Sequence, residues 1–381
     1  MTTNQDLHWM LHALTLAQKG RYSTRPNPAV GCVIVQGDTL VGEGWHQKAG
    51  EPHAEVLALH QAANKAQGAT VYVTLEPCSH YGRTPPCANA LVRAGVKRVV
   101  VAMQDPNPLV SGQGLAILRD AGIEVTVGIC ETQAQALNAG FNKRMQHKKP
   151  YVRLKLASSV DGRTAMASGE SVWITGAQAR QQVHLMRAQH GAIITGIGTV
   201  LADDPSLNVR LEADILAQHG LTQELCHPLR VVLDPHLSMP LTAKMLTLPG
   251  RTLVVSSADS VELNRSVADA LLAQGAEIVA VQAAEDRLDL ESVLDYLAQE
   301  EQVNDVMVES GAIVAGAFIE AGLVDELHWF LAPHLMGHQG KPLLMLPGLV
   351  TMQDRIQLQT KSVTPIGDDF HFVFGFKAYN P

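Results

Sequence analysis

The chain has 381 residues, of which 46% are hydrophobic and 17% are charged, and its formal net charge is −8. This length predicts two domains with ample core material, and the acidic balance without a Lys/Arg block argues against nucleic acid as a partner. No apolar stretch is long enough to span a membrane. The first predicted element is an amphipathic helix, because Leu7, Met10, Leu11 and Leu14 fall at helical spacing before Gly20. No basic segment precedes it, so this helix is not typical of a signal peptide.

The five cysteines do not suggest a disulfide framework, which is typical of a reducing compartment. Three of them, Cys32, Cys130 and Cys226, lie in apolar or loop segments and are interpreted as unreactive thiols. We therefore expect a cytoplasmic protein.

Strands and helices alternate through the rest of the first half. A turn at 36–38 predicts a hairpin between strands Ala29–Val35 and Leu40–Trp45. The elements predicted after it are a helix from His53, a strand over Thr70–Leu75, a helix over Cys87–Ala94, a strand over Arg98–Ala102, a helix after Gly114, a strand over Ile123–Val127 and a helix from Thr132 to Met145. Together they predict a compact α/β layer.

The segments His53-Ala54-Glu55, Pro77-Cys78 and Cys87 carry the clearest chemistry. One imidazole and two thiols suit a catalytic zinc, which takes three protein ligands and leaves one position open for water. The pattern is similar to the zinc-deaminase signature H-x-E…P-C-x-x-C, but here the eight residues 79–86 separate the two cysteines. Because this insert holds one glycine and two prolines, it favours a loop over a helix. We expect a loop beside the substrate and a zinc ion held by His53, Cys78 and Cys87.

In such a site Glu55 is not a ligand and is free to move protons. It converges with His53 only if the metal lies at the N-terminus of the helix, because residues two apart point to nearly opposite helix faces. Pro52 supports a helix start there, since proline is tolerated at the first helical position. The alternative is a solvated Glu55 in the first turn, favoured only by the helix dipole.

The basic and polar stretch from Arg144 to Pro150 is the predicted domain boundary, giving domains over 1–147 and 148–381. Strands and helices alternate again in the second domain, without an internal repeat. Its predicted strands are Tyr151–Leu156, Ala192–Thr195, Arg230–Leu233, Thr252–Val255, Glu277–Val281, Val306–Val308, Glu326–His334 and Phe370–Phe376.

The chemistry of the second domain is less explicit. It has no G-x-G-x-x-G fingerprint, so a standard dinucleotide fold is not predicted. Gly311 follows the predicted strand Val306–Val308 and precedes a helical run, where backbone N–H groups approach an anion. Arg187 and Arg210 suit a phosphate, although a lone arginine is usually a solvated surface charge. These features alone indicate only a nucleotide or phosphate binder.

Four strings together make the sequence resemble a known enzyme family. They are His53-Ala54-Glu55, TLEPCSHYGRTPPC from Thr74 to Cys87, LASSVDGRTA from Leu156 to Ala165 and TVLADDP from Thr199 to Pro205. Over essentially the whole chain, the sequence resembles the bacterial bifunctional riboflavin-biosynthesis deaminase/reductases, which share the eight-residue spacing. The resemblance implies a two-domain α/β protein, with an N-terminal cytidine-deaminase-like three-layer domain and a C-terminal dihydrofolate-reductase-like domain.

The resemblance also implies two reactions on a small phosphorylated pyrimidine. The first is zinc-dependent hydrolytic deamination of 2,5-diamino-6-ribosylamino-4(3H)-pyrimidinone 5′-phosphate. The second is NADPH-dependent reduction of the ribosyl group to a ribityl group, which gives 5-amino-6-ribitylamino-uracil 5′-phosphate. Glu55 would be the catalytic residue of the deaminase, with one zinc ion per deaminase domain.

Site residues of the second domain follow from the resemblance and not from spacing. It places NADPH against Ala157, Trp173, Thr199, Asp203, Gly311, Ala312, Ile313, Val314, Ala315, Gly316 and Ala317. It places substrate against Ser171, Arg187, Leu207, Arg210 and Glu309. In the deaminase pocket, Pro26-Asn27-Pro28, His46 and Arg83 fall on the substrate side. Lys155 and Asp203 are both open as proton donors for the reductase.

Two other functions remain open at this point. One is a cytidine, deoxycytidylate or transfer-RNA deaminase with an accessory domain, of which the acidic balance disfavours the RNA version. The other is a non-enzymatic module with a structural zinc, although His46, His60 and His80 lack the spacing of a fourth ligand. The oligomeric state is also open, and a homo-oligomer is compatible with the sequence.

Overall fold

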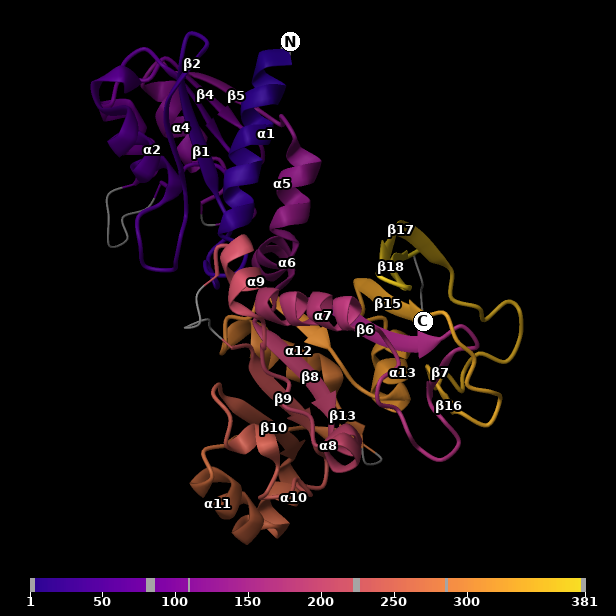
Figure 1. Ribbon diagram of the computed structural model, residues 1–381. Helices are drawn as coiled ribbons and strands as arrows, with labels where there is room; N and C mark the ends of the chain where they lie inside the picture. The colour runs from indigo at the N-terminus through magenta and orange to yellow at the C-terminus, as the bar shows by residue number, and fades with distance from the viewer. Residues whose placement is uncertain (1–3, 80–85, 109, 222–226, 285–286, 378–381) are drawn as a thin grey trace. The chain divides into compact units, whose positions relative to one another are not determined.

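A computed structural model describes residues 4–79, 86–108, 110–221, 227–284 and 287–377. The chain divides into two compact units (Figure 1). Unit 1 comprises 1–148 with 217–222, and unit 2 comprises 149–216 with 223–381. Each unit is a sheet with helices packed on both faces.

Unit 1 is built on five strands. They are β1 (Gly31–Gln36), β2 (Thr39–Trp45), β3 (Thr70–Val73), β4 (Arg98–Val101) and β5 (Glu124–Val127), in the sheet order β2-β1-β3-β4-β5. The predicted hairpin is confirmed, because β1 and β2 pair antiparallel with Gln36 opposite Thr39. β3 is antiparallel to β1, whereas β3, β4 and β5 are parallel to one another.

The helices of unit 1 form a layer on each face of this sheet. They are α1 (Asn4–Lys19), α2 (Ala54–Ala62), the 3-10 helix η1 (Ala63–Ala66), α3 (Cys87–Arg93), α4 (Gln113–Asp120), α5 (Glu131–Leu137) and α6 (Ala139–His147). Alternate side chains of a strand point to opposite faces, so Cys32 and Ile34 pack with α2, α3 and α4. Val33 and Val35 pack instead with α1 and α5. The predicted three-layer architecture is confirmed.

The face that α1 buries differs from the predicted one. Met10 is fully buried, but Leu7 and Leu11 are 43% and 44% exposed. Ala13 is buried against Gly31 of β1, where an added Cβ atom would stand 2.0 Å from the Ala13 carbonyl oxygen. Small residues on both elements allow this close approach, so the buried face keeps Met10 and Leu14 of the predicted set and is centred on the small residues and not on Leu7 and Leu11.

The predicted helix from Thr132 to Met145 is in fact two helices, α5 and α6, which meet at Asn138. The Asn138 side chain accepts a hydrogen bond from the Ala29 backbone N–H (2.8 Å) and donates one to the Ala29 carbonyl oxygen (3.0 Å). These bonds join residues 109 apart in sequence. A buried asparagine that binds the backbone of a distant segment does not change the hydrophobic periodicity of the sequence around it. The break between α5 and α6 was therefore not predicted.

Unit 2 is built on a larger mixed sheet. Its nine strands are β6 (Tyr151–Ser159), β8 (Ala192–Gly196), β9 (Leu229–Leu233), β10 (Thr252–Ser257), β11 (Glu277–Val281), β14 (Asp305–Val308), β15 (Glu326–Ala332), β17 (Leu358–Ile366) and β18 (Asp369–Phe376). Their order is β11-β10-β9-β8-β14-β6-β15-β18-β17, and all neighbours are parallel except the last two pairs. Two small sheets pair β7 (Arg163–Ala165) with β16 (Lys341–Pro342) and β12 (Ala283–Ala284) with β13 (Arg287–Leu288).

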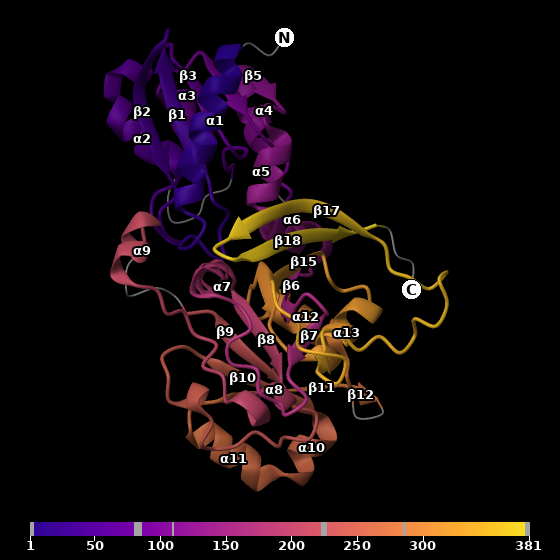
Figure 2. The same cartoon turned by 45° about the vertical axis from the view of Figure 1, so that its right-hand side comes forward.

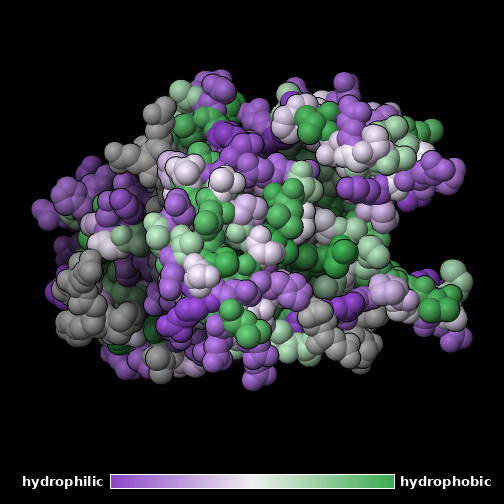
Figure 3. All heavy atoms as spheres, turned by 90° about the horizontal axis from the view of Figure 1, so that it is seen from below, coloured by the Kyte–Doolittle hydropathy of each residue, from purple (hydrophilic) through white to green (hydrophobic). Residues whose placement is uncertain are grey.

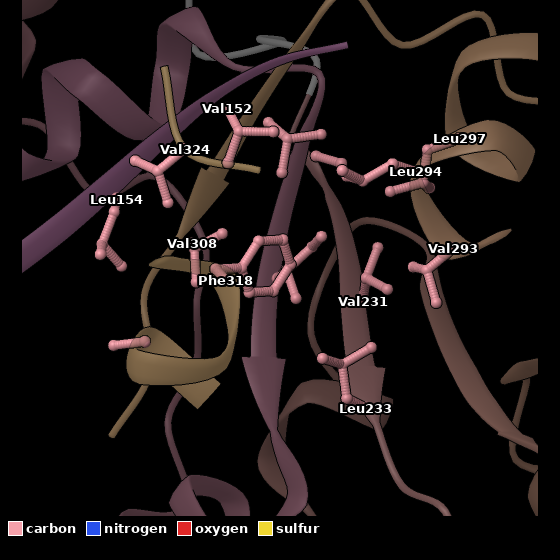
Figure 4. Packing of buried hydrophobic residues seen from close by; sticks show 14 of the residues in the cluster. Val152, Leu154, Val231, Leu233, Val293, Leu294, Leu297, Val308, Phe318 and Val324 are labelled. Atoms are coloured by element: carbon pink, nitrogen blue, oxygen red, sulfur yellow. The ribbon is translucent and has the colours of Figure 1, made fainter. Parts of the chain in front are cut away.

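Helices cover both faces of this sheet. They are α7 (Ala177–Gln189), α8 (Ile197–Asp203), α9 (Ala213–Gln218), the 3-10 helix η2 (Lys244–Leu246), α10 (Ala258–Leu263), α11 (Arg265–Ala273), α12 (Leu290–Gln299) and α13 (Ala312–Glu320). α12 and α13 pack on one face, where Phe318 lies between Val308 and Val231 (Figure 4). α7, α8 and α11 pack on the other face. The alternation of strands and helices that the sequence predicted is thus a sheet with a helical layer on each face.

One strand of the nine-stranded sheet was missed, as were the short strands β7, β12, β13 and β16. β17 forms the sheet edge and pairs antiparallel with β18 (Figure 2). Eight of its nine residues are exposed, so it lacks the alternation of buried and exposed positions on which strand prediction depends. β15 ends at Ala332, two residues before the predicted limit.

The surface carries both polar and apolar side chains, which are interspersed over the face in Figure 3. Leu263 and Val350, each 83% exposed, and Met352, 75% exposed, are the most exposed large apolar side chains of the described residues. Within the described part of the chain, no helix combines the length and the apolar character that crossing a bilayer requires.

Candidate functional site

Three elements of unit 1 bring the predicted zinc ligands together. His53 directly precedes α2 with an extended backbone (φ −70°, ψ 161°), Cys78 follows β3, and Cys87 is the first residue of α3. His53 Nδ1 lies 3.6 Å from Cys78 Sγ and 3.4 Å from Cys87 Sγ. The three ligand atoms all lie within 4.8 Å of one another.

These distances suit a metal ion between the three atoms. Zinc bonds of about 2.3 Å to sulfur and about 2.0 Å to nitrogen place tetrahedral ligand atoms roughly 3.5 Å apart. No further His, Cys, Asp or Glu joins the group among the described residues. The pKa of the Cys78 thiol is lowered to about 4 because the Cys87 side chain hydrogen-bonds to it. The group therefore includes a thiolate, which is the form that binds metal.

Glu55 lies in the first turn of α2 and is 3% exposed, so the alternative of a solvated side chain is wrong. Burial, together with the nearby Cys78 side chain, raises the pKa of its carboxyl to about 7. The Cys87 side chain also hydrogen-bonds to this carboxyl. His53 and Glu55 converge because His53 stands outside the helix as its N-cap. Pro52 precedes that cap, so the expectation that it is the first helical residue is wrong.

A chain of hydrogen bonds runs from Asn27 through His46 to Pro52, the residue before His53. His46 is 3% exposed, and its Nε2 lies 3.1 Å from Asn27 Nδ2 while its Nδ1 lies 3.2 Å from the Pro52 carbonyl oxygen. Burial lowers the pKa of His46. The neutral ring can therefore accept from Asn27 and donate to Pro52. Arg83, His80 and Cys226, which the sequence analysis also discussed, lie outside the described residues.

In unit 2 the structure brings together three of the predicted substrate residues. Arg187 of α7 donates to both carboxylate oxygens of Glu309, at 2.9 and 2.8 Å. Lys155 Nζ lies 3.5 Å from the same carboxylate. Burial by itself would raise the pKa of Glu309, but Arg187 and Lys155 lower it to about 2. Arg210 reaches Asn208 Oδ1 at 2.9 Å, and Arg187 donates to the Asn208 carbonyl oxygen at 3.1 Å.

His184 belongs to this cluster and was missed. Its Nδ1 accepts a hydrogen bond from the Arg210 backbone N–H at 3.2 Å. Burial, together with the charges of Arg187 and Arg210, lowers the pKa of His184 to about 4. His184 and Arg187 are three residues apart on α7 and therefore share a face, which is the signal that could have identified His184.

The remaining predicted substrate residues differ in accessibility. Ser171 is half-buried in the segment before α7. The Leu207 side chain is 2% exposed and packs in the core under α7. Leu207 is therefore buried as a whole residue, and its backbone has a positive φ of 45°.

The predicted cofactor residues gather partly at the start of α13. Thr199 Oγ1 accepts a hydrogen bond from the Gly311 N–H at 3.2 Å. Ile313 is 69% exposed, whereas Ala315 and Gly316 face the core, and a Cβ atom on Gly316 would stand 1.9 Å from the Met345 carbonyl oxygen. Ala312, Val314, Ala317 and Ala157 are half-buried, and Asp203 is exposed at the end of α8. Trp173 is 70% exposed beneath the Arg180 guanidinium, 4.6 Å from its ring centroid.

Known families match both units. Residues 3–103 match the "Cytidine and deoxycytidylate deaminase zinc-binding region", and residues 150–372 match the "RibD C-terminal domain". The "Riboflavin biosynthesis protein RibD" of Escherichia coli (strain K12) is 49% identical over 368 residues, which cover 96% of this chain and 98% of that protein. The protein of the same name from Aquifex aeolicus (strain VF5) is 41% identical over 375 residues, covering 98% and 99%.

Solved structures agree with these matches. Acinetobacter baumannii RibD, form 1, is 48% identical, with a TM-score of 0.89 and coverage of 98% of this chain and 99% of that chain. A Thermotoga maritima diaminohydroxyphosphoribosylaminopyrimidine deaminase/5-amino-6-(5-phosphoribosylamino)uracil reductase is 32% identical, with a TM-score of 0.84 and the same coverage. These relatives match nearly the whole chain, including the second unit, which the alternative interpretation treated as an accessory domain. The chain therefore belongs to the RibD family of two-domain riboflavin biosynthesis proteins.

Proposed function

We propose that the chain catalyses two successive steps of riboflavin biosynthesis on one phosphorylated pyrimidine. In the first, 2,5-diamino-6-ribosylamino-4(3H)-pyrimidinone 5′-phosphate loses an amino group by hydrolysis. In the second, NADPH reduces the ribosyl group to ribityl, and the product is 5-amino-6-ribitylamino-uracil 5′-phosphate. The observation that carries the first step is the convergence of His53, Cys78 and Cys87 beside the buried carboxyl of Glu55.

The deaminase centre supplies a nucleophile and a proton carrier. When bound by His53, Cys78 and Cys87, zinc lowers the pKa of water and makes hydroxide available near neutral pH. Glu55 accepts one proton from the attacking water and delivers it to the ring nitrogen, and it then transfers the proton of the added hydroxyl group to the amino group, which departs as ammonia. A carboxyl whose pKa is about 7 suits both roles, since it gains and loses a proton near the working pH.

The reductase centre binds the sugar phosphate beside the cofactor. Lys155, Arg187 and Arg210 outnumber the single carboxylate of Glu309, so the cluster has an excess of positive charge for a phosphate. Arg187 is already paired with Glu309, and the exposed Arg210 is therefore the better phosphate contact. NADPH lies against the exposed start of α13 and Thr199, where it supplies the hydride while the protein orients it.

The full-length protein with Glu55→Gln tests the first step. We expect ammonia release from the diaminopyrimidinone substrate to be lost, with zinc content and NADPH oxidation on the deaminated substrate retained. Glu51→Gln changes an exposed carboxylate nearby and is the matched control. Undiminished ammonia release from Glu55→Gln would overturn the proposed mechanism, and ammonia release from cytidine or deoxycytidylate would overturn the proposed substrate.

A further inference from the structure

Glu76 is a buried carboxylate next to the zinc centre that has no role in the chemistry above. It is 3% exposed, and its two oxygens accept hydrogen bonds from four backbone N–H groups. Oε2 accepts from Asp105 (3.1 Å) and Gly112 (3.0 Å), and Oε1 accepts from Gly114 (2.9 Å) and Leu115 (3.3 Å). No Lys or Arg pairs with Glu76 among the residues that the structure describes, so backbone dipoles alone compensate its charge.

These bonds attach the beginning of α4 to the segment that follows β3. The first residues of a helix have backbone N–H groups without a partner inside the helix. The N-cap of α4 is Gly112, which has no side chain to bind them. Glu76 supplies the missing acceptor from a distance of 36 to 39 residues in sequence, and a carboxylate at a helix N-terminus is also favoured by the helix dipole.

The same contact fixes the backbone immediately before Cys78. A Cβ atom at Gly114 would stand 2.0 Å from the Pro77 carbonyl oxygen, so α4 lies directly against Pro77. The neighbouring helix α3 binds the same segment, because the Ala88 N–H donates to the Cys78 carbonyl oxygen at 3.2 Å and the Cys87 N–H donates to Cys78 Sγ at 3.3 Å. Both helices thus contact the short Glu76–Cys78 segment.

We propose that Glu76 is a positioning residue of the zinc centre, which holds Pro77 and Cys78 so that the Cys78 sulfur stays in reach of His53 and Cys87. Four converging N–H donors need an acceptor with two oxygens. A glutamine of the same shape would turn an N–H₂ group towards two of these donors and release part of the α4 contact. The Cys78 sulfur would then lose its fixed position, although every zinc ligand is still present.

The test measures zinc release from full-length protein with a chromophoric chelator. Outer-shell substitutions typically cost roughly 10- to 100-fold in metal affinity or activity, and we expect Glu76→Gln to release zinc at least 10-fold faster. The kcat of deamination should fall more than KM changes, and the reductase activity of the same molecule should be retained. Glu76→Asp keeps both oxygens on a shorter side chain and should restore part of the zinc retention. Glu131→Gln, an exposed carboxylate of α5, is the matched control.

A purely structural role predicts a different result. Glu76→Gln would then lower the melting temperature, while zinc release measured well below that temperature would equal that of Glu131→Gln. That outcome overturns the proposal, and so does a Glu76→Asp variant that loses zinc as fast as Glu76→Gln. The inference rests on the zinc centre proposed above, whose own failure is distinguishable, because Cys78→Ser would then retain zinc.

Discussion

Gly42 of β2 lies directly against the carbonyl oxygen of Ala58 in α2, so closely that a Cβ atom at position 42 would stand 2.2 Å from that oxygen. Gly44, on the same face of the strand, is in a similar position, with 2.7 Å between an added Cβ atom and the Ala54 carbonyl oxygen. The helix that carries Glu55 and follows His53, a proposed zinc ligand, therefore rests on two glycines. Helix position and zinc geometry depend on the absence of two side chains.

Gly42→Ala should therefore weaken zinc binding although position 42 is not part of the zinc centre. Backbone atoms cannot yield to the new methyl group as a flexible side chain would, so α2 must shift, and overpacking of this kind costs about 1–3 kcal/mol. We expect a lower melting temperature of unit 1 and weaker zinc binding, measured by calorimetry and chelator competition. Gly42→Val should be worse than Gly42→Ala. A Gly42→Ala protein with unchanged melting temperature and zinc affinity would contradict this account.

Removing the metal should separate the two activities. Cys78→Ser replaces a thiolate ligand by a poor one, so we expect loss of bound zinc and of ammonia release. NADPH oxidation on the deaminated substrate should continue, because none of the groups in the Arg187–Glu309 cluster is a zinc ligand. Metal analysis and the two assays on one preparation check this. Loss of both activities at full solubility would mean that the reductase also needs the metal.

The grouping of His53, Cys78 and Cys87 could be predicted because its information is local. His53 and Glu55 are two residues apart, and Cys78 and Cys87 flank a single loop, so spacing and ligand chemistry were sufficient to select them. Even the convergence of His53 and Glu55 at a helix start followed from helix geometry. The details that depend on packing were less accessible: Pro52 was expected to be the first helical residue, but α2 begins two residues later, at Ala54.

The reductase cluster shows the opposite case. Arg187 and Glu309 are 122 residues apart, and only the order of β14 beside β8 and β6 in the sheet brings them together. Nothing in a single sequence encodes that pairing, so these residues came from the family resemblance. His184 has the helical spacing to Arg187, but that spacing is common, and its significance appears only with Arg210 in place.

Glu309→Gln should destabilise unit 2 more than the loss of a surface ion pair would. Arg187 and Glu309 have side-chain exposures of 10% and 16%, and removing one partner of a buried pair costs about 3–5 kcal/mol. Because both side chains are partly exposed, the expected loss of unfolding free energy lies towards the lower end of this range. Glu277→Gln breaks a two-oxygen pair with the half-exposed Arg251 and should cost about 0–1 kcal/mol. Equal melting temperatures for the two variants would contradict the assignment of a buried pair.

His371 should make the stability of unit 2 depend on pH. Its ring stacks on Phe330 with centroids 4.2 Å apart, and its Nε2 lies 3.0 Å from His328 Nδ1. Burial, together with the neighbouring His328, lowers the pKa of His371 to about 4.

The sign of this dependence follows from proton binding. Between about pH 6.5, the usual pKa of an exposed histidine, and about pH 4, the unfolded chain binds a proton that the folded unit does not. The contribution of His371 to the free energy of unfolding is therefore fully present above about pH 6.5. It is lost as the solution is acidified towards pH 4, by on the order of 1–2 kcal/mol after allowance for solvent screening.

The matched variant is His371→Phe, which keeps an aromatic ring against Phe330 but cannot bind a proton. Other buried histidines, such as His184 and His328, also make unit 2 less stable in acid. The melting temperature of the variant should therefore still fall between pH 7 and pH 4.5, but less steeply. Calorimetry of both proteins at matched ionic strength measures the difference between the two slopes. Parallel slopes would show that His371 takes up its proton as readily in the folded unit as in the unfolded chain.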